Sequence, residues 1–555
     1  MSGQTQAAAM TGGMAIVESL IAMGVERVYG LPGAQLYSLF DALAQRADRI
    51  RTYGARHEQT CGYMAFGAAR STGRPGVFAV VPGPGVLNAG AALATALGCC
   101  APVMCITGQV PSAFIGRGRG HLHELPDQLA TLRSITKWSA RIETPADVPE
   151  VMAEAWRQMT SGRPGPVAIE MAWDRMAASG EVAMPQAFPV AAAGEPDARE
   201  IEAAVALIEG ARRPMIMTGT GAQGAAASVR ELAEFLDAPV AAFRGGRGIV
   251  AEDHPLGVSS YAAFKLWPQT DLLIGIGSRL EMPFMRWAGM MQLIDKPAPP
   301  PYLIRIDIDA EEMRRLVPHA GIVADAEAAT RALVAALRKG RRVRTPDALA
   351  EIATAKRAAR AEIQKVQPQL AYLDVIREVL PRDAFLVPEL SQAGFTSYFG
   401  YDVREPRTYV SEGYQGTLGF GFPTSLGVKA ANPGRVVVSM SGDGGFMFGV
   451  QELATAAQEG LGVVAIVFNN RAFGNVLRDQ RTNFGNRTIG SALANPDLMT
   501  LAKAFGVEGH RVGSPEDLRP VLAKAIVAVT PQLIEIEVAQ GSEVSPWEFI
   551  HLKHQ

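Results

Sequence analysis

Short runs of apolar, often β-branched residues alternate along this chain with longer segments of helical character. The pattern begins with a helix predicted at residues 15–23 and a strand at residues 27–30, and it continues to about residue 173. The same alternation returns in two later regions of the chain. Strands that alternate with helices normally pair in parallel and are covered by helices on both faces. We therefore predict an α/β fold of three doubly wound parallel-sheet domains.

Stretches rich in alanine, glycine and proline separate the three regions. The expected domains are residues 11–176, 197–338 and 366–555, with linkers at 177–196 and 338–363. The second linker is basic and alanine-rich, so we expect a solvated connecting helix there rather than a nucleic-acid patch.

The strongest chemical pattern lies in the third region, where two apolar strands each end in polar residues. The first strand ends at Gly442-Asp443-Gly444-Gly445, a helix is predicted at about 446–459, and the second strand ends at Asn469-Asn470. Strands joined by a helical crossover are normally parallel neighbours, so their carboxyl ends meet at one ligand-binding edge. Carboxylate and amide oxygens suit Mg2+, and glycine N–H groups at a helix start suit a phosphate. The residues alone predict a Mg2+–diphosphate site; the alternative is a capped turn without a ligand.

This pattern resembles the thiamine diphosphate (ThDP) motif of the acetolactate synthase and pyruvate decarboxylase superfamily, and the likeness covers essentially the whole chain. The resemblance implies that Asp443, Asn470 and the backbone carbonyl of Ala472 hold Mg2+. It also implies that the cofactor is lined by Gly442, Gly444, Gly445, Asn470, Ala472 and Gly474.

Two other segments of the third region resemble cofactor-binding positions of that superfamily. Gln392 follows a predicted strand at a position near the diphosphate. Gly416-Thr417-Leu418 is similar to a family Gly-Thr-Met run. The resemblance implies that the Gly416 carbonyl accepts a hydrogen bond from the aminopyrimidine and that Leu418 wedges between the two rings of ThDP, an orientation effect. The alternative for Leu418 is an ordinary core leucine.

The first region contains Arg56-His57-Glu58-Gln59 before a helix of small residues, which resembles the family's glutamate motif. The resemblance implies that Glu58 lies against the pyrimidine ring and favours the tautomer that removes the proton from C2 of ThDP. Considered alone, Glu58 would be a surface or helix N-terminal acid. Pro32 and Gly33, which open the second helix, are further expected cofactor-binding residues.

Four residues are expected at the substrate. Asn88 ends a glycine–proline turn that resembles the family's substrate loop, and Phe473 lies on the turn after Asn470. His123 stands where acetolactate synthase-like proteins usually carry a glutamine, and we expect it to act as a general acid, because imidazole titrates near neutral pH. Local hydrogen bonding is the alternative. Trp547 is expected either in a lid over the site or in a packed terminal strand.

The central region contains Gly219-Thr-Gly221-Ala-Gln-Gly224 after the strand at residues 214–217. This pattern favours dinucleotide binding, but the acidic residue expected about twenty positions later is missing. In the superfamily this domain binds FAD in some members, ADP or CoA in others, and nothing in many. FAD or ADP/CoA is therefore left open.

Composition excludes some classes of protein. The 53 Lys and Arg nearly balance the 55 Asp and Glu, so no nucleic-acid or membrane partner is expected. The most apolar window, residues 77–108, is interrupted by prolines and glycines, which indicates buried core rather than a membrane span. The four cysteines lack CxxC spacing, so we expect reduced thiols in a cytoplasmic protein.

The predicted function is ThDP- and Mg2+-dependent decarboxylation of a pyruvate-like 2-oxo acid, with carboligation as in acetolactate synthase. Alternatives are a 2-oxo acid decarboxylase of benzoylformate or pyruvate type, and a 2-hydroxyacyl-CoA or oxalyl-CoA lyase. Outside this class, a ThDP- or nucleotide-binding regulator or a nicotinamide dehydrogenase would also carry some of these motifs. The resemblance further implies a homodimer or homotetramer with ThDP between the first domain of one subunit and the third domain of its neighbour.

Overall fold

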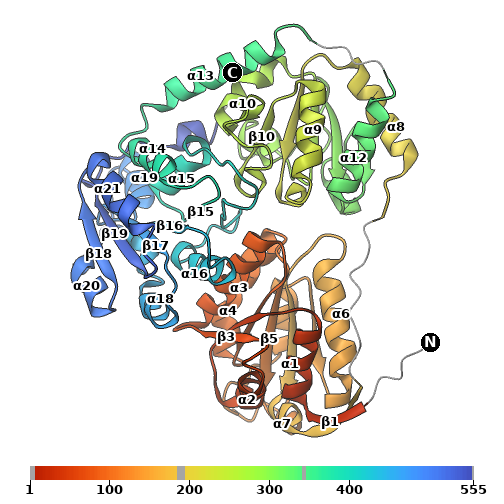
Figure 1. The fold of residues 1–555 in the computed structure, drawn as a ribbon, viewed down its shortest axis with the longest axis vertical. Helices are drawn as coiled ribbons and strands as arrows, with labels where there is room; N and C mark the ends of the chain where they lie inside the picture. The colour runs from red at the N-terminus through yellow and green to blue at the C-terminus, as the bar shows by residue number, and fades with distance from the viewer. Residues whose placement is uncertain (1–6, 184–193, 341–344, 553–555) are drawn as a thin grey trace.

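Three parallel β-sheets organise the computed structural model, which describes residues 7–183, 194–340 and 345–552 (Figure 1). The strand orders are β3-β2-β4-β5-β7-β6, β11-β10-β9-β12-β13-β14 and β15-β16-β17-β19-β18. All pairs within these three sheets are parallel, and helices pack against them. The predicted α/β class with three doubly wound sheets is confirmed.

Successive residues of the first sheet face opposite cores, as the alternation of side chains along a strand requires. Val28 and Val77 face a core shared with α1, α2 and α6, whereas Tyr29 and Phe78 face a core shared with α3 and α4. The strands are β2 (Arg27–Gly30), β3 (Arg51–Gly54), β4 (Gly76–Val80), β5 (Val103–Gln109), β6 (Trp138–Ile142) and β7 (Val167–Ala172). The helices are α1 (Gly12–Ala22), α2 (Tyr37–Gln45), α3 (Glu58–Thr72), α4 (Pro84–Gly98), α5 (Gln128–Ile135) and α6 (Val148–Thr160).

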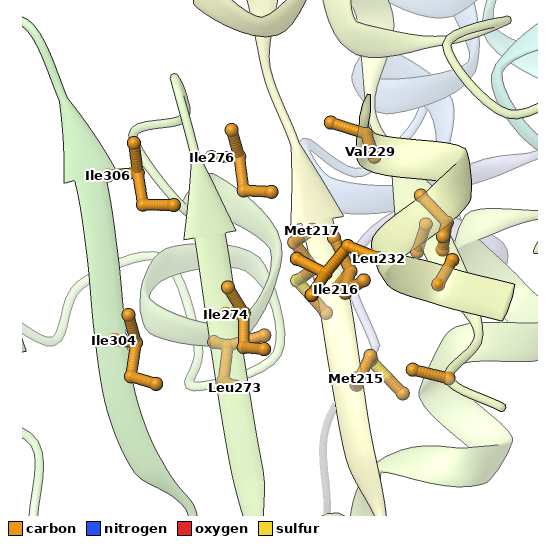
Figure 2. Close-up of a cluster of buried hydrophobic side chains, with 14 of the residues drawn as sticks. Met215, Ile216, Met217, Val229, Leu232, Leu273, Ile274, Ile276, Ile304 and Ile306 are labelled. Carbon is orange, nitrogen blue, oxygen red and sulfur yellow. The ribbon is translucent and has the colours of Figure 1, made fainter. Parts of the chain in front are cut away.

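The central sheet is buried by long aliphatic side chains on adjacent strands. Figure 2 shows Ile216, Ile274 and Ile304 in one row across β9, β12 and β13, with Leu232 of α9 packed beside them. The strands are β9 (Pro214–Thr218), β10 (Val240–Ala242), β11 (Gly257–Val258), β12 (Leu272–Ile276), β13 (Tyr302–Asp307) and β14 (Ala320–Val323). The main helices are α8 (Ala198–Gly210), α9 (Ala226–Leu236), α10 (Ser260–Leu266) and α12 (Ala326–Leu337).

The third sheet carries the strand–helix–strand unit of the predicted diphosphate site. Its strands are β15 (Phe385–Pro388), β16 (Val437–Gly442), β17 (Val464–Asn469), β18 (Glu508–Val512) and β19 (Gln532–Glu537). The single helix predicted at 446–459 is wrong, because α17 (Asp443–Phe446) and α18 (Leu453–Glu459) are separated by a turn and a short 3-10 helix, Val450–Glu452. A Cβ on Gly449, inside this break, would overlap the ring of Pro423.

Two other expectations about the ends of domains need correction. The linker expected from residue 177 begins with β8 (Ser179–Ala183), which pairs antiparallel with β1 (Ala7–Thr11) in a small separate sheet. Residues 184–193 of that linker lie outside the described residues. In the second linker, α13 (Ala348–Ile363) is a helix as expected, but it buries Ile352, Ala355, Ala359 and Ile363 rather than being fully solvated.

The apolar window at 77–108 forms part of the first domain, as β4, α4 and β5. Among the described residues, no helix has the length and apolar character needed to cross a membrane. All four cysteines are free; Cys100 is partly exposed and the other three are buried.

The first and third domains meet along α3 and α16 (Gly421–Ala431), which lie side by side in Figure 1. Glycines allow the two helix backbones to approach closely. A Cβ on Gly67 would overlap the carbonyl oxygen of Thr424, and a Cβ on Gly427 would overlap that of Met64. The contact therefore leaves no room for even one methyl group.

We predict that Gly427→Ala lowers the thermal unfolding midpoint. Overpacking of this kind costs about 1–3 kcal/mol, which exceeds the gain of about 1 kcal/mol in helix propensity. Differential scanning calorimetry checks this, with Gly434→Ala as the control because a Cβ there meets nothing within 4 Å. Equal midpoints for Gly427→Ala and the unmodified protein would contradict the prediction.

Candidate functional site

Parallel pairing of β16 and β17 brings Asp443 and Asn470 to one edge of the third sheet. Gly442 lies opposite Phe468, so Asp443 leaves β16 at nearly the level at which Asn470 leaves β17. Asp443 is the first residue of α17 and is only 2 % exposed. A buried carboxylate at the start of a helix and an amide on the next strand therefore share one edge, as the crossover connection predicts.

A hydrogen-bond network fixes the Asp443 carboxylate. Its Oδ2 accepts a bond from Asn495 Nδ2 at 2.6 Å, and Asn495 also donates to Asn469 Oδ1 at 3.1 Å. Asn469 in turn donates to the buried Glu535 at 2.7 Å. Burial raises the pKa of Asp443, although the Asn495 bond opposes the shift. A nearby cation stabilises the charged form of a buried carboxylate whose pKa is raised in this way.

Asn470 is held on both sides of its amide group. Its Oδ1 accepts from the backbone N–H of Ala472 at 3.0 Å, and its Nδ2 donates to Glu543 Oε2 at 2.5 Å. Burial raises the pKa of Glu543, and the negative charge of Asp443 adds to this shift. Two carboxylates and an amide are thus close together.

The donor types at this edge fit a hard divalent cation. A carboxylate, an amide oxygen and a backbone carbonyl are all oxygen donors of the kind that Mg2+ prefers. No group of three or more His, Cys, Asp or Glu side chains suited to a metal occurs in the part of the chain that the structure describes. A candidate metal site in the described residues must therefore combine different kinds of oxygen donor, as the set of Asp443, Asn470 and the Ala472 carbonyl does.

Close backbone approach explains the glycines around this edge. A Cβ on Gly444 would collide with the ring of Phe473, and one on Gly474 would lie 2.7 Å from Asn470 Nδ2. A Cβ on Gly445 would overlap Glu389. The structure thus brings Phe473 against the glycine loop and Gly474 against Asn470.

Glu389 ties this loop to the segment that contains Leu418. Its Oε1 accepts from Gly419 N–H at 2.6 Å, and its Oε2 accepts from Gly421 N–H at 2.9 Å and from Ser441 Oγ at 3.0 Å. Burial raises the pKa of Glu389 to about 7, although these three donors favour the charged form. A single buried carboxyl group therefore links the end of β16 to the segment of residues 418–421.

Leu418, Gly416 and Gln392 have environments that suit a bound cofactor. Leu418 is partly exposed, whereas Phe420 two residues later is fully buried, so Leu418 is not a core leucine. Gly416 has a φ of +61°, which favours glycine. Gln392, the first residue of α15 (Gln392–Gly400), is 7 % exposed and its Oε1 has no hydrogen-bond partner among the described residues. Such a buried acceptor is stabilised by a donor from a ligand.

The residues expected in the first domain form a second cluster. Glu58 is the first residue of α3, and Asn88 of α4 donates to its Oε2 at 3.1 Å. A Cβ on Gly85 would lie 3.6 Å from Glu58 Cγ, and one on Gly33 would overlap the side chain of Val81. The Pro32–Gly33 turn, the residue 81–85 turn and the start of α3 are therefore packed together.

His123 lies beside the same turn, in a left-handed backbone conformation with a φ of +68°. A Cβ on Gly83 would overlap the carbonyl oxygen of His123. Its Nδ1 lies 2.9 Å from Oε1 of the buried Gln35, whose Nε2 donates to Leu122 O at 2.9 Å. Because an amide oxygen only accepts, this arrangement places a proton on Nδ1.

Trp547 packs on the third domain. It begins a short 3-10 helix, Trp547–Phe549, and not the terminal strand that was one expectation. Its ring contacts Phe395 with centroids 4.8 Å apart, and its Nε1 donates to Asn475 Oδ1 at 2.5 Å. The C-terminal segment is therefore fixed against the start of α19 (Gly474–Asn483).

Sequence analysis missed Glu389, Asn495, Glu543 and Gln35. Glu389 directly follows β15. Asp443 was identified because it follows a parallel strand at its carboxyl end, where ligands bind, and the same reasoning could have identified Glu389. Asn495 and Glu543 lie in irregular segments without a periodic pattern, and Gln35 lies in a short 3-10 helix, so no sequence signal marks them.

A cavity of about 680 Å³ lies between the central domain and its neighbours. The Gly219–Gly221 turn lines it, and so do five arginines: Arg70, Arg163, Arg244, Arg279 and Arg407. Burial lowers the pKa of Arg407, and the neighbouring Arg70 adds to this shift. Two guanidinium groups so close together are stabilised by an anion, which makes the cavity a candidate site for a phosphate-containing ligand.

The three domains match, in order, the domains of one class of proteins, the thiamine diphosphate enzymes. Residues 10–131 match the N-terminal TPP binding domain of thiamine pyrophosphate enzymes, residues 201–333 match the central domain, and residues 391–536 match the C-terminal TPP binding domain. Thiamine pyrophosphate is another name for ThDP. The chain belongs to this enzyme family.

Proteins similar over most of their length include one decarboxylase and several synthases. A probable 2-ketoarginine decarboxylase of Pseudomonas aeruginosa is 34% identical over 92% of this chain and 90% of that protein. A probable acetolactate synthase large subunit of Methanocaldococcus jannaschii is 32% identical over 95% and 92%. The acetolactate synthase isozyme 1 large subunit of Escherichia coli is 31% identical over 97% and 95%. The protein is thus a ThDP-dependent, acetolactate synthase-like enzyme.

We predict that Glu389→Gln weakens ThDP binding about tenfold. The amide can accept from only one of the two backbone N–H groups, and a buried donor without an acceptor costs about 1–3 kcal/mol. Isothermal titration calorimetry with ThDP at saturating Mg2+ checks this. The exposed Glu516→Gln is the control, and unchanged affinity in Glu389→Gln would contradict the prediction.

Proposed function

We propose that this enzyme decarboxylates a 2-oxo acid with ThDP and Mg2+ as cofactors. Asp443, Asn470 and the Ala472 carbonyl would hold the metal. The observation that carries this proposal is that Asp443 and Asn470 leave neighbouring parallel strands at nearly the same level, beside a glycine loop. When bound, ThDP supplies an electron sink for the carbon atom that loses CO2.

The chain's own residues would orient the cofactor and handle protons. Glu58, itself oriented by Asn88, would accept a hydrogen bond from the pyrimidine ring. Gln392 would accept through its free Oε1, Gly416 through its carbonyl, and Leu418 would separate the two rings. His123 would exchange a proton with the substrate or product through Nε2.

The substrate class is supported by the names of the relatives, which are a probable 2-ketoarginine decarboxylase and two acetolactate synthase large subunits. Both reactions begin with loss of CO2 from a 2-oxo acid and differ in whether a proton or a second carbonyl compound is taken up afterwards. The placement of His123 beside the Glu58 cluster favours protonation, and thus a decarboxylase that releases an aldehyde.

Product analysis after incubation with ThDP, Mg2+ and either pyruvate or 2-ketoarginine tests this function. We expect an aldehyde product from at least one of the two acids. Acetolactate from pyruvate would instead support the synthase function. No consumption of either acid, despite saturable ThDP binding, would contradict both functions for these substrates.

We also propose a homodimer or homotetramer. In it, the Glu58 cluster of one subunit and the Asp443–Asn470 edge of another subunit complete one site. Within the described chain, Glu58 is bonded to Asn88 of its own domain, and Asp443 to Asn495 of its own domain. Several large apolar side chains on segments that carry or adjoin the site residues are exposed, and a second subunit would cover them. They are Tyr37, Leu87 and Leu122 in the first domain and Phe448, Val476 and Phe484 in the third.

We predict that Glu58→Gln lowers turnover by at least about 100-fold while ThDP binding changes little, because the amide cannot replace the carboxylate in proton transfer. Asp443→Asn should lose both turnover and Mg2+ affinity.

When the two inactive variants are mixed and allowed to exchange subunits, about a quarter of normal activity should return, because half of the dimers then contain one intact site. No recovery despite exchange would place the whole site within one chain.

For the central cavity we propose an anionic nucleotide, with FAD and ADP or CoA as the candidates. Arg407→Ala and Arg70→Ala should each weaken ADP binding about tenfold or more, because hydrogen bonds to charged groups contribute about 1.5–3 kcal/mol. Calorimetry checks this, with the surface variant Arg157→Ala as control. The visible absorption of the purified protein tests FAD. If the purified protein shows no FAD absorption and binds neither ADP nor CoA, the proposal is contradicted.

A further inference from the structure

Glu543 contacts the metal-site asparagine from a part of the chain that no cofactor motif includes. Its Oε2 lies 2.5 Å from Asn470 Nδ2. A carboxylate without its proton can only accept hydrogen bonds, so the amide nitrogen of Asn470 must face Glu543. The amide oxygen then faces the opposite side, toward the backbone N–H of Ala472. This contact selects one of the two orientations of an otherwise nearly symmetric group.

The segment that carries Glu543 is itself fixed. Val544 donates its backbone N–H to Gln367 O at 2.9 Å, and its carbonyl accepts from Gln369 Nε2 at 2.7 Å. Ser545 Oγ accepts from Arg478 at 2.6 Å. With the Trp547–Asn475 bond, residues 543–547 form a strap that is bonded to Asn470 after β17 and to Asn475 and Arg478 of α19. Glu543 therefore meets Asn470 from a defined direction.

The orientation of this amide matters because only its oxygen can bind a hard cation. An inverted amide would turn its NH2 group toward the metal, and the site would lose one of its ligands. Groups that orient a metal ligand typically change metal affinity by about 10–100-fold when they are removed.

We propose that Glu543 is a positioning residue that holds the Asn470 oxygen toward the Mg2+ site, and thereby sets the metal affinity of the enzyme; this rests on the proposed function of Asp443 and Asn470. It acts through Asn470 and not as a ligand of the metal. The strap is thus a structural part of the cofactor site.

Binding of Mn2+ in place of Mg2+, measured by electron paramagnetic resonance with ThDP present, tests the proposal without a substrate. We expect Glu543→Ala to weaken Mn2+ binding about tenfold or more. Glu543→Gln should weaken it clearly less, because the amide oxygen of glutamine can still accept from Asn470 Nδ2. The matched control is Glu548→Gln, on the same segment, where the side chain is 52% exposed and pairs with Lys365.

The outcomes separate this proposal from the function on which it rests. If the unmodified protein does not bind Mn2+ with ThDP, the proposed metal site itself fails. If it binds and Glu543→Ala binds equally well, Glu543 has no positioning role. Equal losses in Glu543→Ala and Glu543→Gln would show that the charge acts directly on the metal, and this would also overturn the proposal. Calorimetric unfolding of each variant identifies losses that come from misfolding.

Discussion

The parallel pairing of β16 with β17 is the constraint on which the rest of the site depends. It sets Gly442 opposite Phe468 and thereby places Asp443 and Asn470 at the same level of one sheet edge. A shift of this register by one residue would turn every side chain to the opposite face. The glycines, the buried Glu389 and the C-terminal strap all contact residues whose positions this pairing has already fixed.

Three carboxyl groups that are largely removed from water lie at or beside this edge of the sheet. Asp443, Glu389 and Glu543 all have a raised pKa, mainly because of burial. Each accepts hydrogen bonds from amide or hydroxyl groups, which compensate part of the desolvation. A divalent cation at the proposed site would supply the remaining compensation for Asp443.

The fold class and the core of the site could be predicted because they follow from periodic patterns. Alternating strands and helices indicated the three sheets, and the strand-end rule placed Asp443 beside Asn470. Glu58 required a family resemblance, since a single acid before a helix has no distinctive pattern. The break inside residues 446–459 was missed because only tertiary packing, such as Gly449 against Pro423, reveals it. The pairing of β1 with β8 and the contact of Glu543 with Asn470 join segments distant in sequence, and no local pattern encodes such contacts.

The glycine contacts between α3 and α16 restrict how the enzyme can move. Because the two backbones touch at Gly67 and Gly427, the helices cannot slide past each other without a collision of main-chain atoms. Glu58 stands at the beginning of α3, and Leu418 stands three residues before α16, so both belong to one rigid body. A motion that opens or closes the proposed site would then involve whole subunits or surface loops rather than a hinge between these two domains.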